Sequence, residues 1–261
     1  MRSWRAALAA GCLAWLGLTG CAGSVYQASS QPDVVTASDE APEHRRARIR
    51  TDLASGYLQR GQAEVALDEV KLALQAAGDY APAHQVKGLA YMALEQPALA
   101  KVSFDAAMKL TPLDPDLLHN IGWWHCAARD YAQADLWFDR ALDQGAGSRS
   151  WLGKALCAQR GRNAQAEDYF SRAYALAPRD PQVVMAWAMF ASERSRWSQV
   201  HALLDPFNST ELVSAQSLWM QAKALHHMGE SEQARNVGQR LSTDFAVSAQ
   251  AKAYERKLWN E

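Results

Sequence analysis

Small and aromatic residues recur along this chain at the intervals expected of packed helices. The clearest case is a set that repeats 34 positions later: Gly88, Tyr91, Ala100, Phe104 and Ala107, followed by Gly122, His125, Ala134, Phe138 and Ala141. Within each set, intervals of three and four place neighbours on one side of an α-helix. The pattern predicts two successive pairs of helices, with the second helix of the first pair ending at Pro112.

Weaker copies of the pattern lie on both sides of these two. The upstream copy, 34 residues earlier, comprises Tyr57, Gly61, Ala66, Val70 and Ala73. The fourth copy keeps Ala166, Phe170, Ala173 and Pro178, and its interval from Ala134 is shortened to 32 by a compressed loop at Gly145-Ala146-Gly147. Two degenerate copies follow, one from about Pro181 with Ala188 and Trp197, and one with Ala222, Gly229 and Ala234. Residues 246–259 fit a final capping helix.

The repeat resembles the tetratricopeptide repeat (TPR), which has this length and this order of small and aromatic positions. The packing argument agrees with the resemblance. Gly88 and Ala100 let two helices approach closely, Phe104 fills the space between them, and Ala107 admits the next pair. We therefore predict an all-α fold, a right-handed solenoid of about six TPR hairpins plus a C-terminal capping helix over residues 46–261.

The N-terminus has the features of a bacterial lipoprotein signal. Arg2 and Arg5 precede an apolar stretch, and Leu18-Thr19-Gly20-Cys21 closes it. We predict that residues 1–20 are a signal peptide and that Cys21 carries the lipid, such as palmitate, with more than one acyl chain holding the protein on the membrane. The alternative is an ordinary secreted protein with an incidental cysteine. Residues 21–45 are predicted to be a flexible tether, because they lack helical periodicity and large apolar residues.

Charge disfavours two classes of partner, nucleic acid and anionic lipid. The chain has 27 basic and 28 acidic residues, and removal of residues 1–20 takes two arginines away, leaving a net charge near −3. No basic field is available for wrapping nucleic acid, and no polybasic stripe is available for anionic lipid. Neither nucleic acid nor a small-molecule substrate is expected as a partner.

Two cysteines remain after processing, Cys126 and Cys157, because Cys12 leaves with the signal and Cys21 is acylated. An oxidising periplasm permits a disulfide between them. Both residues also fall at helix-packing positions, where a small apolar side chain suffices. The simpler expectation is a reduced, buried pair.

Titratable residues offer no arrangement for catalysis, and we predict no enzyme activity, no metal and no cofactor. His226 and His227 are adjacent on a helix and point about 100° apart, which is poor geometry for a shared metal. His125 occupies the packing position of Tyr91 one repeat earlier. Nucleophile elbows, phosphate loops and zinc motifs are absent from the sequence.

In this repeat family the first helix of each hairpin lines the concave face. The predicted groove residues on these helices are Leu58, Leu89, Met92, His119 and Trp123. Apolar anchors bordered by polar groups suit a bound peptide or helix. The alternative for Trp123 is a place in the core between helices, which is also the expectation for Trp124. A clamp for a terminal carboxylate is not expected, because Gln85 and Leu89 occupy positions where such clamps use Lys and Asn.

Together, the signal, the tether, the opening Gly56-Tyr57-Leu58-Gln59-Arg60-Gly61, six repeats and a short cap resemble the type IV pilus biogenesis/stability lipoproteins, the PilF/PilW group. The resemblance implies a pilotin, an outer-membrane lipoprotein that faces the periplasm, binds the pilus secretin and promotes its assembly into multimers. Ala22 after the lipidated cysteine, where an Asp would signal inner-membrane retention, agrees with that location. The alternative is another periplasmic TPR scaffold that presents cell-wall hydrolases or proteases.

Overall fold

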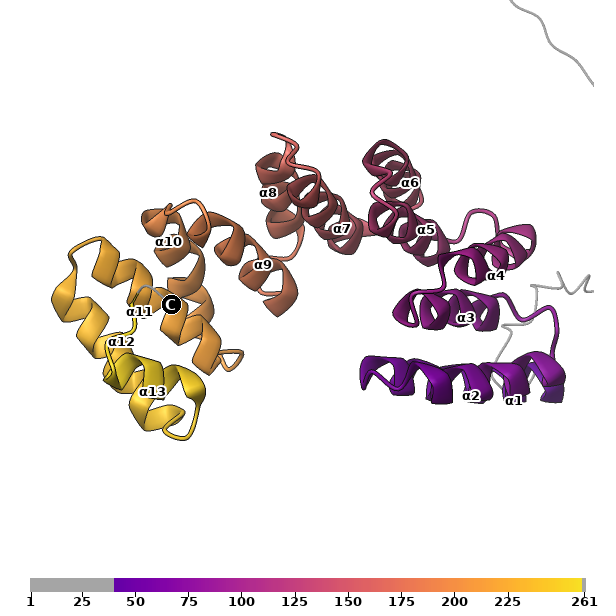
Figure 1. The fold of residues 1–261 in the computed structure, drawn as a ribbon, viewed down its shortest axis with the longest axis horizontal. Coiled ribbons are helices and arrows are strands. Elements are labelled where there is room, and N and C mark those ends of the chain that lie inside the picture. Colours follow the sequence, from indigo (N-terminus) through magenta and orange to yellow (C-terminus); the bar gives the residue numbers. More distant parts are fainter. Residues whose placement is uncertain (1–39, 260–261) are drawn as a thin grey trace, which may run out of the picture. The chain divides into compact units, whose positions relative to one another are not determined.

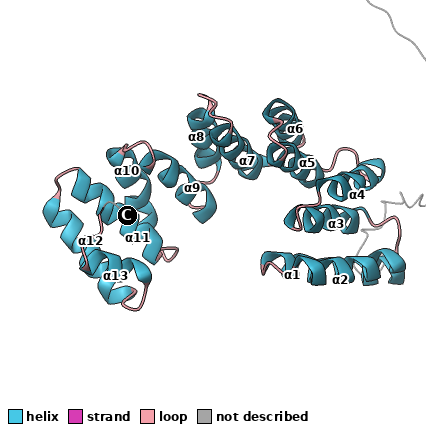
Figure 2. Cartoon of the chain, in the orientation of Figure 1, coloured by secondary structure: helices cyan, strands magenta, loops and turns pink. Residues whose placement is uncertain are grey.

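The computed structural model describes residues 40–259, which contain helices and loops without a strand (Figure 2). The predicted signal peptide, Cys21 and almost all of the predicted tether lie outside these residues. None of the described helices combines the length and the apolar character needed to cross a bilayer. The first helix begins at Pro42, four residues before the predicted start of the solenoid at residue 46.

Thirteen helices follow one another through the described residues as six antiparallel pairs and one final helix (Figure 1). Their bounds are α1 Pro42–Gln59, α2 Ala63–Ala76, α3 Ala81–Ala93, α4 Pro97–Leu110, α5 Pro115–Ala127, α6 Tyr131–Asp143, α7 Gly147–Arg160, α8 Ala166–Leu176, α9 Pro181–Ser192, α10 Trp197–Asn208, α11 Ala215–His227, α12 Ser231–Asp244 and α13 Ala249–Glu255. This confirms the predicted all-α architecture of six hairpins and a C-terminal capping helix.

Local chemistry explains where these helices begin and end. Proline lies in the first turn of α5 and α9, where its missing N–H leaves no intrahelical bond unmade. Asp114 and Asp180 precede these two helices and accept hydrogen bonds from their first backbone N–H groups. Each turn inside a hairpin contains one residue with positive φ, the left-handed conformation that commonly closes a helix: Gly61, Glu95, Arg129, Arg162, Ser195 and Gly229.

The cores of the second and third hairpins each contain a phenylalanine packed against a glycine. A Cβ atom placed on Gly88 would lie 2.4 Å from the ring of Phe104, and one on Gly122 would lie 2.9 Å from the ring of Phe138. Both distances are below van der Waals contact, so only glycine leaves room for the ring. Ala100 is fully buried beside Phe104. The close approach predicted from the 34-residue pattern is confirmed.

The hairpins stack so that the first helices form one layer and the second helices another. Each odd-numbered helix contacts the next odd-numbered helix, whereas no two even-numbered helices are in backbone contact within the described residues. The row therefore bends toward the odd-numbered helices, and α3, α5, α7 and α9 line its inner side in Figure 1. The first helices therefore lie on the concave side, as the resemblance to the repeat family implied.

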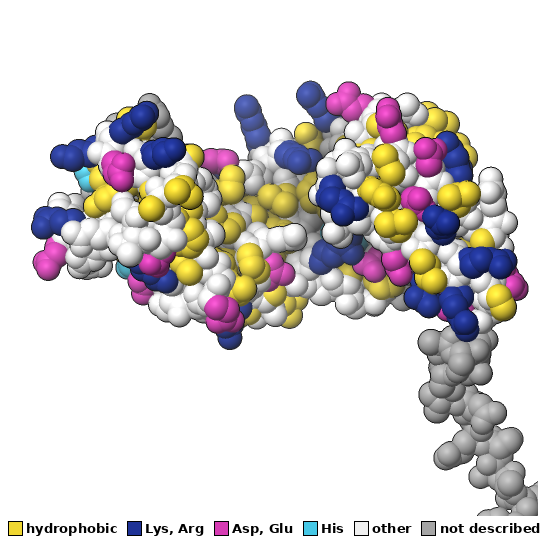
Figure 3. Space-filling view, turned by 90° about the horizontal axis from the view of Figure 1, so that it is seen from below, with side chains coloured by type: hydrophobic (Ala, Val, Ile, Leu, Met, Phe, Trp, Pro, Cys, Tyr) yellow, Lys and Arg dark blue, Asp and Glu magenta, His cyan; other side chains and the backbone are white. Residues whose placement is uncertain are grey.

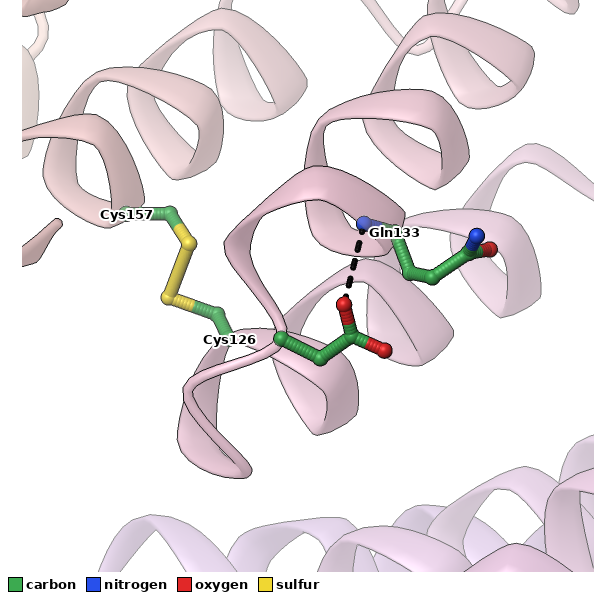
Figure 4. Close-up of a disulfide and its surroundings, with 4 residues drawn as sticks. Cys126, Gln133 and Cys157 are labelled. Carbon is green, nitrogen blue, oxygen red and sulfur yellow. Dashed lines mark hydrogen bonds between the residues drawn. A yellow bond between two sulfur atoms is a disulfide. The ribbon is translucent and has the colours of Figure 1, made fainter. Parts of the chain in front are cut away.

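A disulfide joins Cys126 on α5 to Cys157 on α7, with their Cα atoms 5.8 Å apart (Figure 4). The expectation of a reduced pair is therefore wrong. The two residues occupy neighbouring positions on successive inner helices, which brings them within the usual Cα range for a disulfide. Closing a loop of 31 residues in the unfolded chain stabilises the fold by about 3–4 kcal/mol in the chain-entropy model. The bond fastens the third hairpin to the fourth.

Replacement of Gly88 by leucine should destabilise the fold, because Phe104 must leave its position against the helix. We expect a loss of about 1–3 kcal/mol or more in the free energy of unfolding, measured by urea denaturation. Gly56→Leu is the matched control. Gly56 is also helical, but a Cβ there would meet only Arg60 at 3.9 Å, so the change should be neutral or slightly stabilising. Equal effects at the two positions would contradict the packing described.

Candidate functional site

A cavity of about 480 Å³ opens on the inner side of the row, over α3, α5 and α7. Its lining residues are Leu89, Met92, His119, Asn120, Trp123, Ala127, Arg149, Leu152, Leu156, Arg160 and Gln182. Four of the five predicted groove residues are among them. Leu58 is the exception, because its side chain packs partly against the core of the first hairpins instead. The structure therefore brings together Leu89, Met92, His119 and Trp123 and leaves Leu58 out.

Trp123 belongs both to the cavity and to the core, which reconciles the two predicted alternatives. The ring meets Phe138 edge to face, with centroids 5.9 Å apart, and packs against the cluster that contains the disulfide. It also lines the cavity, where the guanidinium carbon of Arg160 lies 5.1 Å from the ring centroid. That distance allows a cation–π interaction. The tryptophan thus forms a rigid part of the cavity wall.

His119 lies in the wall of the cavity but contributes little accessible surface to it, because only 4% of the residue is exposed. Its Nδ1 lies 3.0 Å from the Oγ of the buried Ser150, which ties α5 to α7. Burial, together with the positive charge of Arg149, lowers the pKa of His119 to about 3. The ring is therefore neutral at pH 7 and acts as a packing and hydrogen-bonding group.

The repeat pattern did not predict that α7 contributes residues to the cavity. Arg149, Leu152, Leu156 and Arg160 are three, four and four residues apart, so they share one face of this helix. The face presents two leucines between two arginines to the cavity. A signal for it exists in the sequence, since Trp123 and Leu156 are 33 residues apart and Met189 follows after another 33. The predicted register used the interval of 32 between Ala134 and Ala166 on the second helices, and the first helices do not share that interval.

A second cavity of about 530 Å³ adjoins the first and shares Leu156 and Arg160 with it. Its other lining residues come from the end of α7 and from α9 with the turns that follow them: Gln159, Arg162, Ala186, Met189, Glu193 and Arg194. We call the two cavities together the inner groove. In Figure 3, which looks toward this side from below, hydrophobic side chains gather in the recessed middle and basic side chains border them. The inner groove runs across four successive first helices, from α3 to α9.

The other aromatic and histidine residues considered in the sequence have structural partners. Trp124 packs against the core of the second and third hairpins and donates its indole N–H to the carbonyl of Pro97 at 2.9 Å, as expected for a packing residue. His125 stacks on Trp137, with centroids 6.2 Å apart. His226 and His227 stack on different rings, Trp259 and Trp197. Among the described residues, no three His, Cys, Asp or Glu side chains lie together as metal ligands would.

Lys154 is a buried cation that holds α7 against α6. Its side chain is 6% exposed, its Nζ lies 3.3 Å from a carboxylate oxygen of Asp135, and Asp139 accepts a hydrogen bond from it. Burial acts to lower the pKa of Lys154, but the two carboxylates outweigh burial and raise it. The ammonium also lies 4.7 Å from the ring centroid of Tyr169. With all these partners, Lys154 has a structural role between the third and fourth repeats.

Comparison with known proteins agrees with this architecture. A family model described as tetratricopeptide repeat matches residues 81–112. Over 247 residues the chain is 26% identical to the type IV pilus assembly protein PilF of Pseudomonas aeruginosa, and the alignment covers 92% of this chain and 94% of that protein. The chain therefore matches the tetratricopeptide repeat model over one repeat, and it is similar to PilF along nearly the whole length of both chains.

Solved structures show the same fold. A crystal structure of PilW, described as a widely conserved type IV pilus biogenesis factor, superposes with a TM-score of 0.63 at 22% identity and covers 79% of this chain and 97% of its own. The structure of Pseudomonas aeruginosa PilF gives a TM-score of 0.61 at 20% identity, covering 83% and 100%. YrrB, described as a TPR protein with an unusual peptide-binding site, gives 0.51 at 13% identity, covering 72% and 97%.

The neutral, buried His119 should make the fold sensitive to acid. Between about pH 6.5 and pH 3 the unfolded chain binds a proton at this residue that the folded chain does not, so stability falls as the pH is lowered. From pH 7 to pH 5 the contribution is about 2 kcal/mol. The free energy of unfolding, measured by urea denaturation, should change less between pH 7 and pH 5 in His119→Gln than in the unmodified protein. The two changes should differ by about 2 kcal/mol. An unchanged difference would mean that His119 is protonated in the fold.

Proposed function

We propose that this protein acts in type IV pilus biogenesis by binding the pilus secretin in the inner groove and promoting its assembly into multimers at the outer membrane. The observation that carries the proposal is the alignment with PilF, which extends over nearly the whole of both chains and therefore includes all the helices that build the groove. The fold likeness to PilW and PilF supports it.

The chemistry of the inner groove fits a protein segment better than a small molecule. Its apolar lining is distributed over four helices as a strip, with Leu89, Trp123, Leu156 and Met189 as the large members. A strip of this kind suits the spaced anchors of an extended or helical segment, and Trp is enriched among residues that dominate such interfaces. Because Trp123 packs against Phe138 and the cluster with the disulfide, its side chain loses little conformational entropy when a partner binds.

Lipidation of Cys21 would supply the membrane attachment. The motif Leu18-Thr19-Gly20-Cys21 supports this part of the proposal, and the residues between Cys21 and α1 would act as the tether. A flexible segment of about twenty residues spans roughly 25 Å on average. The repeats would then face the periplasm at a short distance from the membrane, where a secretin subunit can be reached.

Loss of an exposed anchor should weaken capture of the secretin without unfolding the repeats. Met189 is 51% exposed and lines the inner groove, so Met189→Ser should keep its melting temperature. Its affinity for the secretin should fall about tenfold, measured by pull-down from detergent-solubilised membranes, and secretin multimers should decrease in cells. Trp123→Ala should lose both capture and stability, since Trp123 also packs on Phe138.

The matched control for Met189 is Leu136→Ser on α6. Leu136 is 55% exposed but lies on the layer of second helices, away from the inner groove. It should leave both melting temperature and secretin multimers unchanged. Folded Met189→Ser and folded Leu89→Ser with normal secretin multimers and normal pili would reject this surface as the secretin site and favour another periplasmic scaffold role.

Replacement of Cys21 by alanine should abolish lipid attachment. We expect an uncleaved or soluble species in place of a protein that fractionates with the outer membrane, detected by sucrose-gradient separation and immunoblotting. Cys12→Ala is the control, because Cys12 lies within the predicted signal and should not affect the mature protein. Outer-membrane fractionation of the Cys21→Ala protein would contradict a lipid anchor at Cys21.

A further inference from the structure

Arg160 occupies the point where the two cavities of the inner groove meet, at the C-terminal end of α7. It lines both cavities and lies over the ring of Trp123 at 5.1 Å. Within the described residues, no carboxylate lies within ion-pair distance of its guanidinium. Arg160 is therefore an exposed cation, positioned by an aromatic ring, with no counter-charge of its own.

The other charged residues of the inner groove are already partnered, apart from Arg162. Arg149 forms an ion pair with Asp116. Arg194 donates to the carbonyl of Phe190 at 3.2 Å and lies 3.8 Å from Glu193. Glu193, the one carboxylate in the lining of the two cavities, also accepts a hydrogen bond from Gln159 at 2.8 Å. Four arginines and one glutamate thus leave an excess of positive charge, carried by Arg160 and Arg162, and of these two only Arg160 lines both cavities.

This local charge contrasts with the chain as a whole, in which acidic residues outnumber basic ones. The excess at the inner groove is consequently a property of this surface and does not follow from composition. A guanidinium beside apolar walls attracts carboxylates more strongly than one in open water, because the local dielectric is lower. Its planar fork also matches both oxygens of a carboxylate.

We propose that the inner groove binds an acidic amphipathic peptide segment, whose large apolar side chains contact Leu89, Trp123 and Leu156 and whose Asp or Glu side chain pairs with Arg160. The inference rests on the proposed partner-binding role of the groove and adds the chemistry of the partner. Charge complementarity selects the acidic segment, and the apolar strip requires that hydrophobic residues flank the acid. Electrostatic pairing between exposed charges contributes to association rate and specificity, so binding should weaken with added salt.

The test is to select binders from a displayed library of random 16-residue peptides, using the full lipidated chain in detergent. Enriched peptides should carry Asp or Glu next to aromatic or long aliphatic residues. Synthetic copies should bind about tenfold more tightly than versions with Gln and Asn in place of Glu and Asp. Arg160→Gln should remove this preference and flatten the dependence of affinity on salt. Trp123→Ala should weaken all groove-bound peptides.

Arg140→Gln is the matched control. Arg140 lies 4.5 Å from the ring centroid of Trp137 on α6, the same kind of contact that Arg160 makes with Trp123, but outside the inner groove. This variant should retain the acidic preference. Failure to enrich any peptide, enrichment of neutral or basic peptides, or an acidic preference that survives in Arg160→Gln would overturn the proposal. A dimer that dissociates in Arg160→Gln, seen by sedimentation, would assign the groove to a second copy and also overturn it.

The two proposals can fail separately. An acidic preference that depends on Arg160, combined with normal secretin multimers in cells that express Arg160→Gln, would support the peptide chemistry and reject the secretin as the partner. Loss of secretin multimers in Met189→Ser without any acidic preference in the library would support the secretin role and reject the peptide chemistry.

Discussion

The structure depends on the contact between a small residue on one helix and a phenylalanine on the next. Gly88 against Phe104 and Gly122 against Phe138 bring the two helices of a hairpin so close that no Cβ fits between them. The rings fill the hairpin interior, and buried alanines let the next hairpin stack on it. Every later feature of the inner groove requires this spacing, because it determines where each first helix lies relative to the next.

Stacking by hairpins leaves one face of α3, α5, α7 and α9 uncovered. Within the described residues the backbones of the second helices do not approach one another, whereas the first helices form the continuous inner layer. Their uncovered faces carry Leu89, Trp123, Leu156 and Met189, which would be core residues if another helix packed over them. A surface of this kind remains available for a partner, and the disulfide between α5 and α7 makes its centre rigid.

Three polar or covalent contacts stabilise the third and fourth hairpins. The disulfide, the bond between His119 and Ser150, and the pairing of Lys154 with two carboxylates all join neighbouring helices from α5 to α7. These contacts support the wall formed by Trp123 and the adjacent Arg160. The partner chemistry that we infer therefore belongs to a part of the repeat array whose geometry is constrained by a disulfide.

The sequence by itself determined the helix class, the number of hairpins, the capping helix and the Gly–Phe contacts, because these depend on local periodicity and on residue size. It also identified Leu89, Met92 and Trp123 as groove residues. Only the tertiary structure decided that Cys126 and Cys157 are bridged, that Leu58 lies outside the cavity, and that Arg149, Leu152, Leu156 and Arg160 complete it. The physical reason is that these properties depend on how one hairpin is offset against the next. Between the third and fourth hairpins the first helices follow an interval of 33 residues and the second helices an interval of 32, whereas both intervals are 34 between the second and third hairpins. A difference of one residue turns a side chain by about 100° around a helix.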